Sequence, residues 1–109
     1  MNTIATKRKD KIELISFETL IEDKYGKPGT ASREKYEADA LAFRLGTMLK
    51  QARKDLGITQ EELANRTGTK KSYISRIERG LSDIQVSTYH KLIAIGLGKQ
   101  LNISIEPLK

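Results

Sequence analysis

Cysteine is absent from the sequence and histidine occurs once, at position 90. Without cysteine the chain can form neither a disulfide framework nor a thiolate metal site, so folding depends on hydrophobic burial, which suits a reducing compartment. His90 has no carboxylate or second histidine at metal-ligand spacing and is interpreted as a surface residue. No catalytic constellation is visible either, so we expect no metal, no small-molecule substrate and no enzyme activity.

Long hydrophobic runs are also missing. No stretch approaches the roughly 18 apolar residues that a membrane span needs, and residues 1–11 are polar and basic with no signal-peptide core after them. A cytoplasmic protein is therefore expected. Gly96 and Gly98 are interpreted as a helix stop, because no following helix or Lys-Ser pair would complete a phosphate loop, and no cofactor is expected.

Positive charge is plentiful and unevenly distributed. The formal net charge is +6. Residues 46–109 contain eleven Lys and Arg against six Asp and Glu, whereas residues 13–44 contain five against seven. A basic balance indicates a polyanionic partner, and here the excess lies in the second half of the chain. The basic residues between Lys7 and Lys11 are interpreted as a flexible, solvated terminus rather than as a DNA-contacting arm.

Two helices are expected before residue 57. The first covers residues 16–25, where apolar residues recur every three or four positions, and it ends at the turn of residues 26–29. The second is long: Thr30 or Ser32 can cap it, and its apolar positions run from Tyr36 to Leu56. Gly46 lies inside this second helix, where glycine costs about 1 kcal/mol relative to alanine, so a bend or break is possible there.

Three shorter helices are expected downstream. Thr59 begins a capping box and a helix that runs to about Thr67, Gly68 turns the chain, and a second helix runs from about Lys70 to Gly80. After a loop, Ser82 or Ser87 can start a third helix, which ends at the glycines of residues 96–98.

The last run, residues 100–106, alternates polar and apolar residues and predicts one half-buried strand. Its apolar residues, Leu101, Ile103 and Ile105, are expected to face the helices. No other strand is visible in the sequence, so this strand needs a partner. Two copies pairing antiparallel across a two-fold axis would form a homodimer, suited to a palindromic site on double-stranded DNA with half-sites about 34 Å apart.

Residues 58–80 form the most informative stretch. Ile58, Leu63, Ala64, Ile74 and Ile77 are predicted to be the inner faces of two helices that cross steeply at the glycine turn. The second helix then projects outward and fits the major groove of DNA. The residues at its exposed positions all have hydrogen-bond donors: Lys70, Lys71, Ser72, Ser75, Arg76 and Arg79.

This stretch resembles the Cro/cI or XRE family of helix-turn-helix proteins, through Ile58-Thr-Gln-Glu-Glu-Leu-Ala64, Gly68 and Ile74-Ser-Arg-Ile-Glu-Arg-Gly80. The resemblance covers about residues 45–95 and implies DNA binding by the helix of residues 70–79. Carried over by position, the base-reading residues would be Lys71, Ser72 and Arg76. The phosphate contacts would be Thr59, Gln60, Lys70, Tyr73 and Arg79.

Glu78 is an acid on a helix that is expected to face phosphates, which suggests that it points inward. In the family that this chain resembles, an arginine of the preceding helix pairs with that glutamate, and Arg53 occupies the matching position. The pair would be structural, and if it is buried, loss of one partner would cost about 3–5 kcal/mol. An exposed pair would contribute almost nothing.

A narrower resemblance is to the HigA-type antitoxins, which pair with HigB or RelE-like mRNA-cleaving toxins. It rests on residues 97–105 and on the helical extension before the motif. It implies an antitoxin that neutralises such a toxin and represses its own operon; the alternative is a free-standing XRE-family repressor. The acidic extension would suit a basic toxin or would pack on its own domain, and the toxin-binding residues would be Phe17, Leu20, Ile21, Tyr25 and Tyr36.

Together these patterns predict an all-α, five-helix, lambda-repressor-like domain with one added strand. Residues 1–15 would be a flexible basic terminus and residues 16–45 a helical extension. Residues 46–97 would form the helix-turn-helix domain and residues 98–109 the dimerisation strand.

Overall fold

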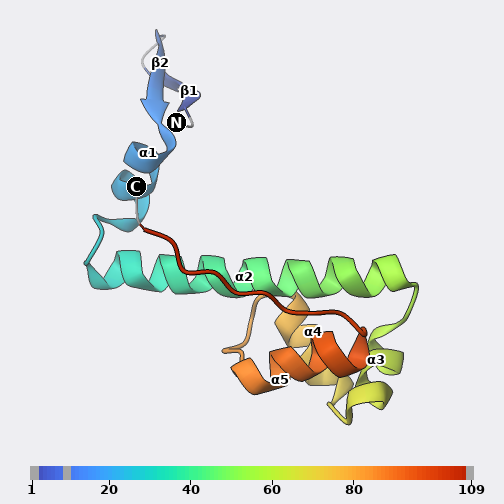
Figure 1. Ribbon diagram of the computed structural model, residues 1–109. Helices are drawn as coiled ribbons and strands as arrows, with labels where there is room; N and C mark the ends of the chain where they lie inside the picture. Colours follow the sequence, from blue (N-terminus) through green and yellow to red (C-terminus); the bar gives the residue numbers. More distant parts are fainter. Residues whose placement is uncertain (1–2, 9–10, 108–109) are drawn as a thin grey trace. The chain divides into compact units, whose positions relative to one another are not determined.

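The computed structural model describes residues 3–8 and 11–107, with side chains from Ser16 onward. The chain forms two compact units, Met1–Asp39 and Ala40–Lys109, referred to below as unit 1 and unit 2. Helix α2, Ala31–Leu56, is continuous and contributes residues to both (Figure 1). The sequence placed the boundary after residue 45, six residues later than the structure does.

Unit 1 begins with two strands, β1 (Thr3–Arg8) and β2 (Lys11–Ser16), which pair antiparallel as a hairpin. The sequence analysis expected no strand before residue 100, so it missed this hairpin. β-Branched residues recur in both strands, and the register sets Ile4 opposite Ile15, an apolar pairing that stabilises a sheet. The basic residues nearby hid this pattern in the sequence. Lys9, part of the predicted basic terminus, lies outside the described residues.

Helix α1 (Phe17–Tyr25) follows β2 directly. The hydroxyl of Ser16 caps it by accepting a hydrogen bond from the backbone N–H of Thr19 at 3.0 Å. The helix ends at Gly26, whose φ of 98° is left-handed and therefore favours glycine. The Tyr25 ring then stacks on Tyr36 of α2, with the ring centroids 4.1 Å apart, so the α1–α2 junction is held by contacts within unit 1.

Gly46 does not bend α2, contrary to one possibility left open by the sequence. It is buried, and a Cβ added there would overlap the backbone carbonyl oxygen of Ile77 in α4. The missing side chain lets the two backbones approach closely, which compensates for the weak helix propensity of glycine. Gly46 is thus the crossing point of α2 and α4.

Unit 2 is built from the second half of α2 and the shorter helices beside it (Figure 1). These are α3 (Gln60–Thr67), α4 (Lys71–Glu78) and α5 (Val86–Lys91), and α5 continues as a π-helical turn, η1 (Leu92–Gly96). The helix expected to end at the glycines of residues 96–98 is therefore present, and its last turn is π-helical. Five side chains at the centre of this unit are fully buried: Leu49, Leu63, Ile74, Ile77 and Leu92.

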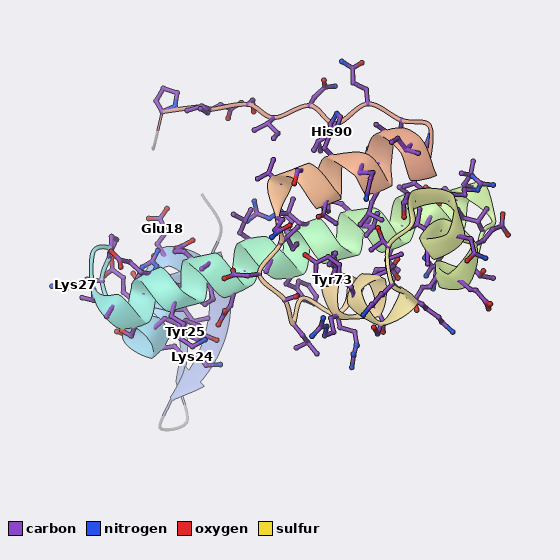
Figure 2. All side chains as sticks on the ribbon, turned by 90° about the horizontal axis from the view of Figure 1, so that it is seen from below. Glu18, Lys24, Tyr25, Lys27, Tyr73 and His90 are labelled. Carbon is purple, nitrogen blue, oxygen red and sulfur yellow. The ribbon has the colours of Figure 1, made fainter. Side chains whose placement is uncertain are left out.

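The strand expected over residues 100–106 is absent from the single chain, where residues 98–107 have no regular secondary structure. Figure 2 shows them as an extended segment outside the helices. Leu101 packs against the core as expected, but Ile103 and Ile105 are 73% and 98% exposed, so the prediction that they face the helices was wrong. Among the described residues of unit 2 there is no strand for this segment to pair with, so the alternating pattern alone does not make a strand.

Within the described ranges, no helix is both long and apolar enough to cross a membrane.

Candidate nucleic-acid interface

Helices α3 and α4 are joined by a short turn at Gly68. Thr59 caps α3, its hydroxyl accepting a hydrogen bond from the N–H of Glu62 at 3.0 Å, which is one half of the expected capping box. Gly68 ends α3 with φ 68° and ψ 19°, and its N–H bonds to the carbonyl of Ala64. This left-handed residue redirects the chain so that α4 starts three residues later, at a new angle.

Helix α4 has one buried and one exposed face. Ile74 and Ile77 are fully buried and Glu78 is 7% exposed, so these three residues fasten the helix to the core. Ser75, predicted to be exposed, is only partly so. The residues on the solvent side carry positive charge or a hydroxyl, and they are Lys70, Lys71, Ser72, Arg76 and Arg79. The structure thus places all three predicted base-reading residues together on one accessible face.

Arg53 of α2 and Glu78 of α4 form the ion pair expected from the sequence, and it is buried. The guanidinium donates from Nε to Oε2 at 2.8 Å and from a second nitrogen to Oε1 at 2.9 Å, a bidentate arrangement. Only 10% of the Arg53 side chain and 2% of the Glu78 side chain is exposed. These hydrogen bonds raise the pKa of Arg53 above its ordinary value.

The same pair also reaches the start of α3. Arg53 donates a third hydrogen bond to the carbonyl of Ile58 at 2.8 Å, and the side-chain amide of Gln60 donates to Glu78 Oε1 at 3.0 Å. Three helices therefore meet at one carboxylate. Gln60, expected to contact phosphate, is held by Glu78 through one amide hydrogen, which leaves the other hydrogen of that NH₂ group available.

Tyr73, also expected to contact phosphate, lies differently from the sequence interpretation. Its ring is partly buried against the core, and its hydroxyl reaches the carbonyl of Asp83 at 3.5 Å (Figure 2). The guanidinium carbon of Arg76 lies 5.7 Å from the centre of the ring. A cation over an aromatic face is attracted to it, so Tyr73 limits the freedom of Arg76 before any ligand binds.

Thr69 lies in the turn between α3 and α4, and the sequence analysis did not single it out. Its Oγ1 atom is buried, and within the part of the chain that the structure describes it makes no hydrogen bond. It stands directly before Lys70, the N-cap of α4, which supplies no side-chain cap. A threonine beside an uncapped helix start was the available signal, because the first N–H groups of a helix need acceptors.

Tyr89 of α5 anchors the far side of this domain. It is 3% exposed, and its hydroxyl donates to the backbone carbonyl of Leu45 in α2 at 2.8 Å. Burial raises the pKa of Tyr89 above its ordinary value because the charged phenolate would be poorly solvated. His90 beside it is exposed, as expected (Figure 2).

The residues assigned to a toxin are largely occupied within unit 1. Ile21 is 8% exposed, and Tyr25 and Tyr36 stack on each other. Leu20 is partly buried, whereas Phe17 is 43% exposed. These residues therefore do not form one open apolar face, and packing on their own unit explains most of the pattern.

Two packed helices joined by a glycine turn, the second with an exposed cationic face, define a helix-turn-helix domain. A helix-turn-helix family model matches residues 49–95. An uncharacterised HTH-type transcriptional regulator of Methanothermobacter thermautotrophicus is 39% identical over 54 residues, which cover 50% of this chain and 77% of the relative. The chain belongs to this family of HTH-type transcriptional regulators, which confirms the expected domain of Cro/cI type.

A second relative, an uncharacterised HTH-type transcriptional regulator of Haemophilus influenzae, is 45% identical over 58 residues. The match covers 53% of this chain and 56% of the relative, so the chain spans little more than half of that protein's length.

Two solved structures are also similar. The restriction-modification controller protein C.AhdI of Aeromonas hydrophila is 31% identical with a TM-score of 0.53, over 56% of this chain and 91% of its own. The clp gene regulator ClgR of C. glutamicum is 30% identical with a TM-score of 0.53, over 56% and 77%.

Proposed function

We propose that this protein is a transcriptional regulator that binds double-stranded DNA sequence-specifically, with α4 in the major groove. The observation that carries the proposal is the exposed cationic face of α4, held rigidly by the buried Arg53–Glu78 pair. An α-helix fits the major groove, and cationic residues on it neutralise phosphates. The family relationship supports this function.

Base recognition is assigned to Lys71, Ser72 and Arg76. Arginine can hold O6 and N7 of guanine with two hydrogen bonds, which is the commonest specific contact in the major groove. The ring of Tyr73 beneath Arg76 favours one placement of the guanidinium and reduces the entropy lost on binding. We therefore expect Arg76 to contribute most to sequence discrimination.

Phosphate contacts are assigned to residues at the edges of this face. Lys70 and Arg79 lie at the two ends of α4, and Thr59 keeps its hydroxyl hydrogen free to donate because the oxygen serves as the helix cap. Gln60 would donate its second amide hydrogen, positioned by Glu78. Such contacts fix the register of the protein on DNA without reading sequence.

We further propose that two copies bind a palindromic operator as a homodimer. Ile103 and Ile105 are exposed and residues 102–106 have no regular secondary structure, which supports antiparallel pairing with a second copy. Sedimentation should then give twice the monomer mass, and Ile103→Lys combined with Ile105→Lys should give monomers. A monomeric parent chain at micromolar concentration would contradict the dimer.

A toxin partner is a weaker hypothesis than a free-standing regulator. It rests on the resemblance to HigA-type antitoxins, and the side chains assigned to toxin binding are mostly engaged inside unit 1. Its test is co-purification with a small basic protein encoded beside this gene. Stable co-purification would favour the antitoxin; its absence would favour the free-standing regulator.

The DNA proposal is tested by selecting a preferred duplex from a random library and comparing Arg76→Ala with Arg44→Ala, an exposed arginine of α2. Losing the Arg76 contact should cost about 1–3 kcal/mol in binding and relax selectivity at one base pair. Lys70→Ala should instead weaken binding to duplexes of all sequences alike. If the parent chain binds no duplex at low salt, or if Arg76→Ala matches the parent, the proposal fails.

A further inference from the structure

We propose that the side of α2 that carries Lys50 and Lys54 binds DNA phosphates at the edge of the major groove that α4 enters. The inference rests on the proposed DNA binding by α4 and extends that surface to a second helix of unit 2. It is carried by the contacts that orient α2 in this unit, together with the position and spacing of the two lysines.

The glycine contacts of α2 and α4 show which side of α2 faces α4. A Cβ added to Gly46 would overlap the carbonyl oxygen of Ile77, and one added to Gly80 would lie 2.9 Å from the Cα atom of Phe43. The end of α4, and the turn that follows it, therefore lie against the side of α2 that carries residues 43 and 46.

Helix α5 lies on the other side of α2. The hydroxyl of Tyr89 donates to the carbonyl of Leu45 at 2.8 Å, and Leu45 and Ala52 pack against the core. In Figure 2, His90 of α5 and Tyr73 of α4 lie on opposite sides of α2. Within unit 2 the long helix is thus flanked by α5 on one side and by the end of α4 on the other.

The helical repeat places both lysines on the α4 side. At 3.6 residues per turn, Lys50 lies about 40° and Lys54 about 80° around the helix from Gly46, in the direction of Phe43. Leu45 lies about 100° in the opposite direction. Both lysine side chains are exposed. They therefore lie on the side of unit 2 where α4 presents its cationic face, and away from α5.

The spacing of the two lysines does not stabilise α2. They are four positions apart, where like charges on a helix repel each other, and neither has an acid three or four positions away along α2. Arg33 and Lys35, by contrast, each pair with an acid four positions later. A polyanion bound at the α4 side of the helix would offset the repulsion between Lys50 and Lys54.

DNA phosphate is the anion that this placement favours. With α4 in the major groove, the phosphate backbones that border the groove lie next to the elements beside α4. Lysine is a point charge on a flexible stem, which suits phosphate. The far side of α2 is mixed in charge, with Arg44 and with Asp55, which accepts a hydrogen bond from Gln51 at 2.8 Å. The α4 side is therefore the more basic of the two.

The test measures how affinity for the selected duplex depends on salt. Lys50→Gln with Lys54→Gln is compared, in the full chain, with Arg44→Gln and Lys91→Gln, which remove one cation from the far side of α2 and one from α5. Each lost phosphate contact reduces the magnitude of the slope of log K against log salt by about 0.9, so two contacts predict a decrease of about 1.8. The control should keep nearly the parent slope.

Two further measurements separate lost contacts from a damaged fold. Base preferences of the Gln variant should match the parent, because phosphate contacts carry no base information. Without DNA it should melt at or slightly above the parent temperature, since a like-charge pair is removed. Lys50→Arg with Lys54→Arg keeps the charge and should keep the slope. Equal slopes for the Gln variant and its control would overturn the inference, as would an equal loss of affinity at every salt concentration.

The two proposals fail in different ways. If the parent chain binds no duplex, DNA binding by α4 fails and the phosphate contacts of α2 fail with it. If Arg76→Ala weakens binding but the Lys50 and Lys54 double variant keeps the parent slope, only the α2 contacts are wrong.

Discussion

Units 1 and 2 are stabilised by different means. Unit 2 encloses five fully buried apolar side chains and a buried ion pair. Of residues 16–39, whose side chains the structure describes in unit 1, Ile21 alone is buried, and contacts such as the Ser32–Tyr25 hydrogen bond and the Arg33–Glu37 ion pair are exposed. Helix α4, which we propose binds DNA, therefore belongs to the unit with the larger buried core. Equal chemical changes should therefore cost far more in unit 2 than in unit 1.

The largest effect is expected for Glu78→Gln. The change leaves the Arg53 guanidinium charged, buried and poorly compensated, which should lower the free energy of unfolding by about 3–5 kcal/mol. Urea denaturation followed by circular dichroism measures it. Glu61→Gln removes the same charge from an exposed position of α3 and should stay within about 0.5 kcal/mol of the parent. A Glu78→Gln protein as stable as the parent would show that the pair is dispensable.

A smaller loss is expected for Gly46→Ala. Helix propensity alone predicts a gain of about 1 kcal/mol, because alanine is the better helix former. The new Cβ would meet the backbone of Ile77, which cannot move aside cheaply, so we expect a net loss of about 1–3 kcal/mol. Thr47→Ala, at an exposed neighbouring position, should follow propensity and be neutral or stabilising. Stabilisation by Gly46→Ala would mean that α2 and α4 cross less closely.

Tyr89→Phe should cost about 1 kcal/mol at neutral pH through loss of the hydrogen bond to Leu45. Burial raises the pKa of Tyr89 in the folded state, so the folded protein keeps its proton at a pH where the unfolded chain has lost it. The associated stability is complete below the unfolded pKa of about 10 and is lost as pH rises toward the folded value. The Phe variant should therefore lose less stability than the parent above pH 10. Parallel pH profiles would contradict this.

The smallest effect is expected in unit 1, for Glu37→Gln. Glu37 accepts a hydrogen bond from Arg33 Nε at 2.8 Å, but its side chain is 59% exposed. Exposed pairs at this helical spacing contribute about 0.3–0.5 kcal/mol. Native-state hydrogen exchange of the amides of residues 31–39 measures the local change. A loss of more than 2 kcal/mol there would erase the contrast between the two units.

The sequence predicted unit 2 better than unit 1, for physical reasons. The start and end of α3 and the exposed face of α4 follow from local chemistry: a threonine cap, a glycine turn and apolar residues at helical spacing. The Arg53–Glu78 pair followed from a family resemblance, since no local rule joins residues 25 positions apart.

The features that the sequence analysis did not predict share a cause. Each depends on contacts with residues distant in the sequence, which a local pattern does not contain. The hairpin depends on pairing between β1 and β2, and basic residues masked its apolar alternation. The sequence analysis interpreted Gly46 from the low helix propensity of glycine, whereas its role is set by the α4 backbone that crosses α2 there. Residues 100–106 alternate as a strand does, but residues 40–107 of unit 2 contain no strand for them to pair with.

The central claim is that the exposed face of α4 binds duplex DNA. Its most direct test is to titrate the ¹⁵N-labelled full chain with the selected duplex and follow every backbone amide by NMR. We predict that the largest chemical-shift changes fall on residues 70–79 and at the start of α3, while the amides around Leu49 and Leu92 move little. Saturable binding with the largest changes elsewhere, and none on residues 70–79, would contradict the assignment.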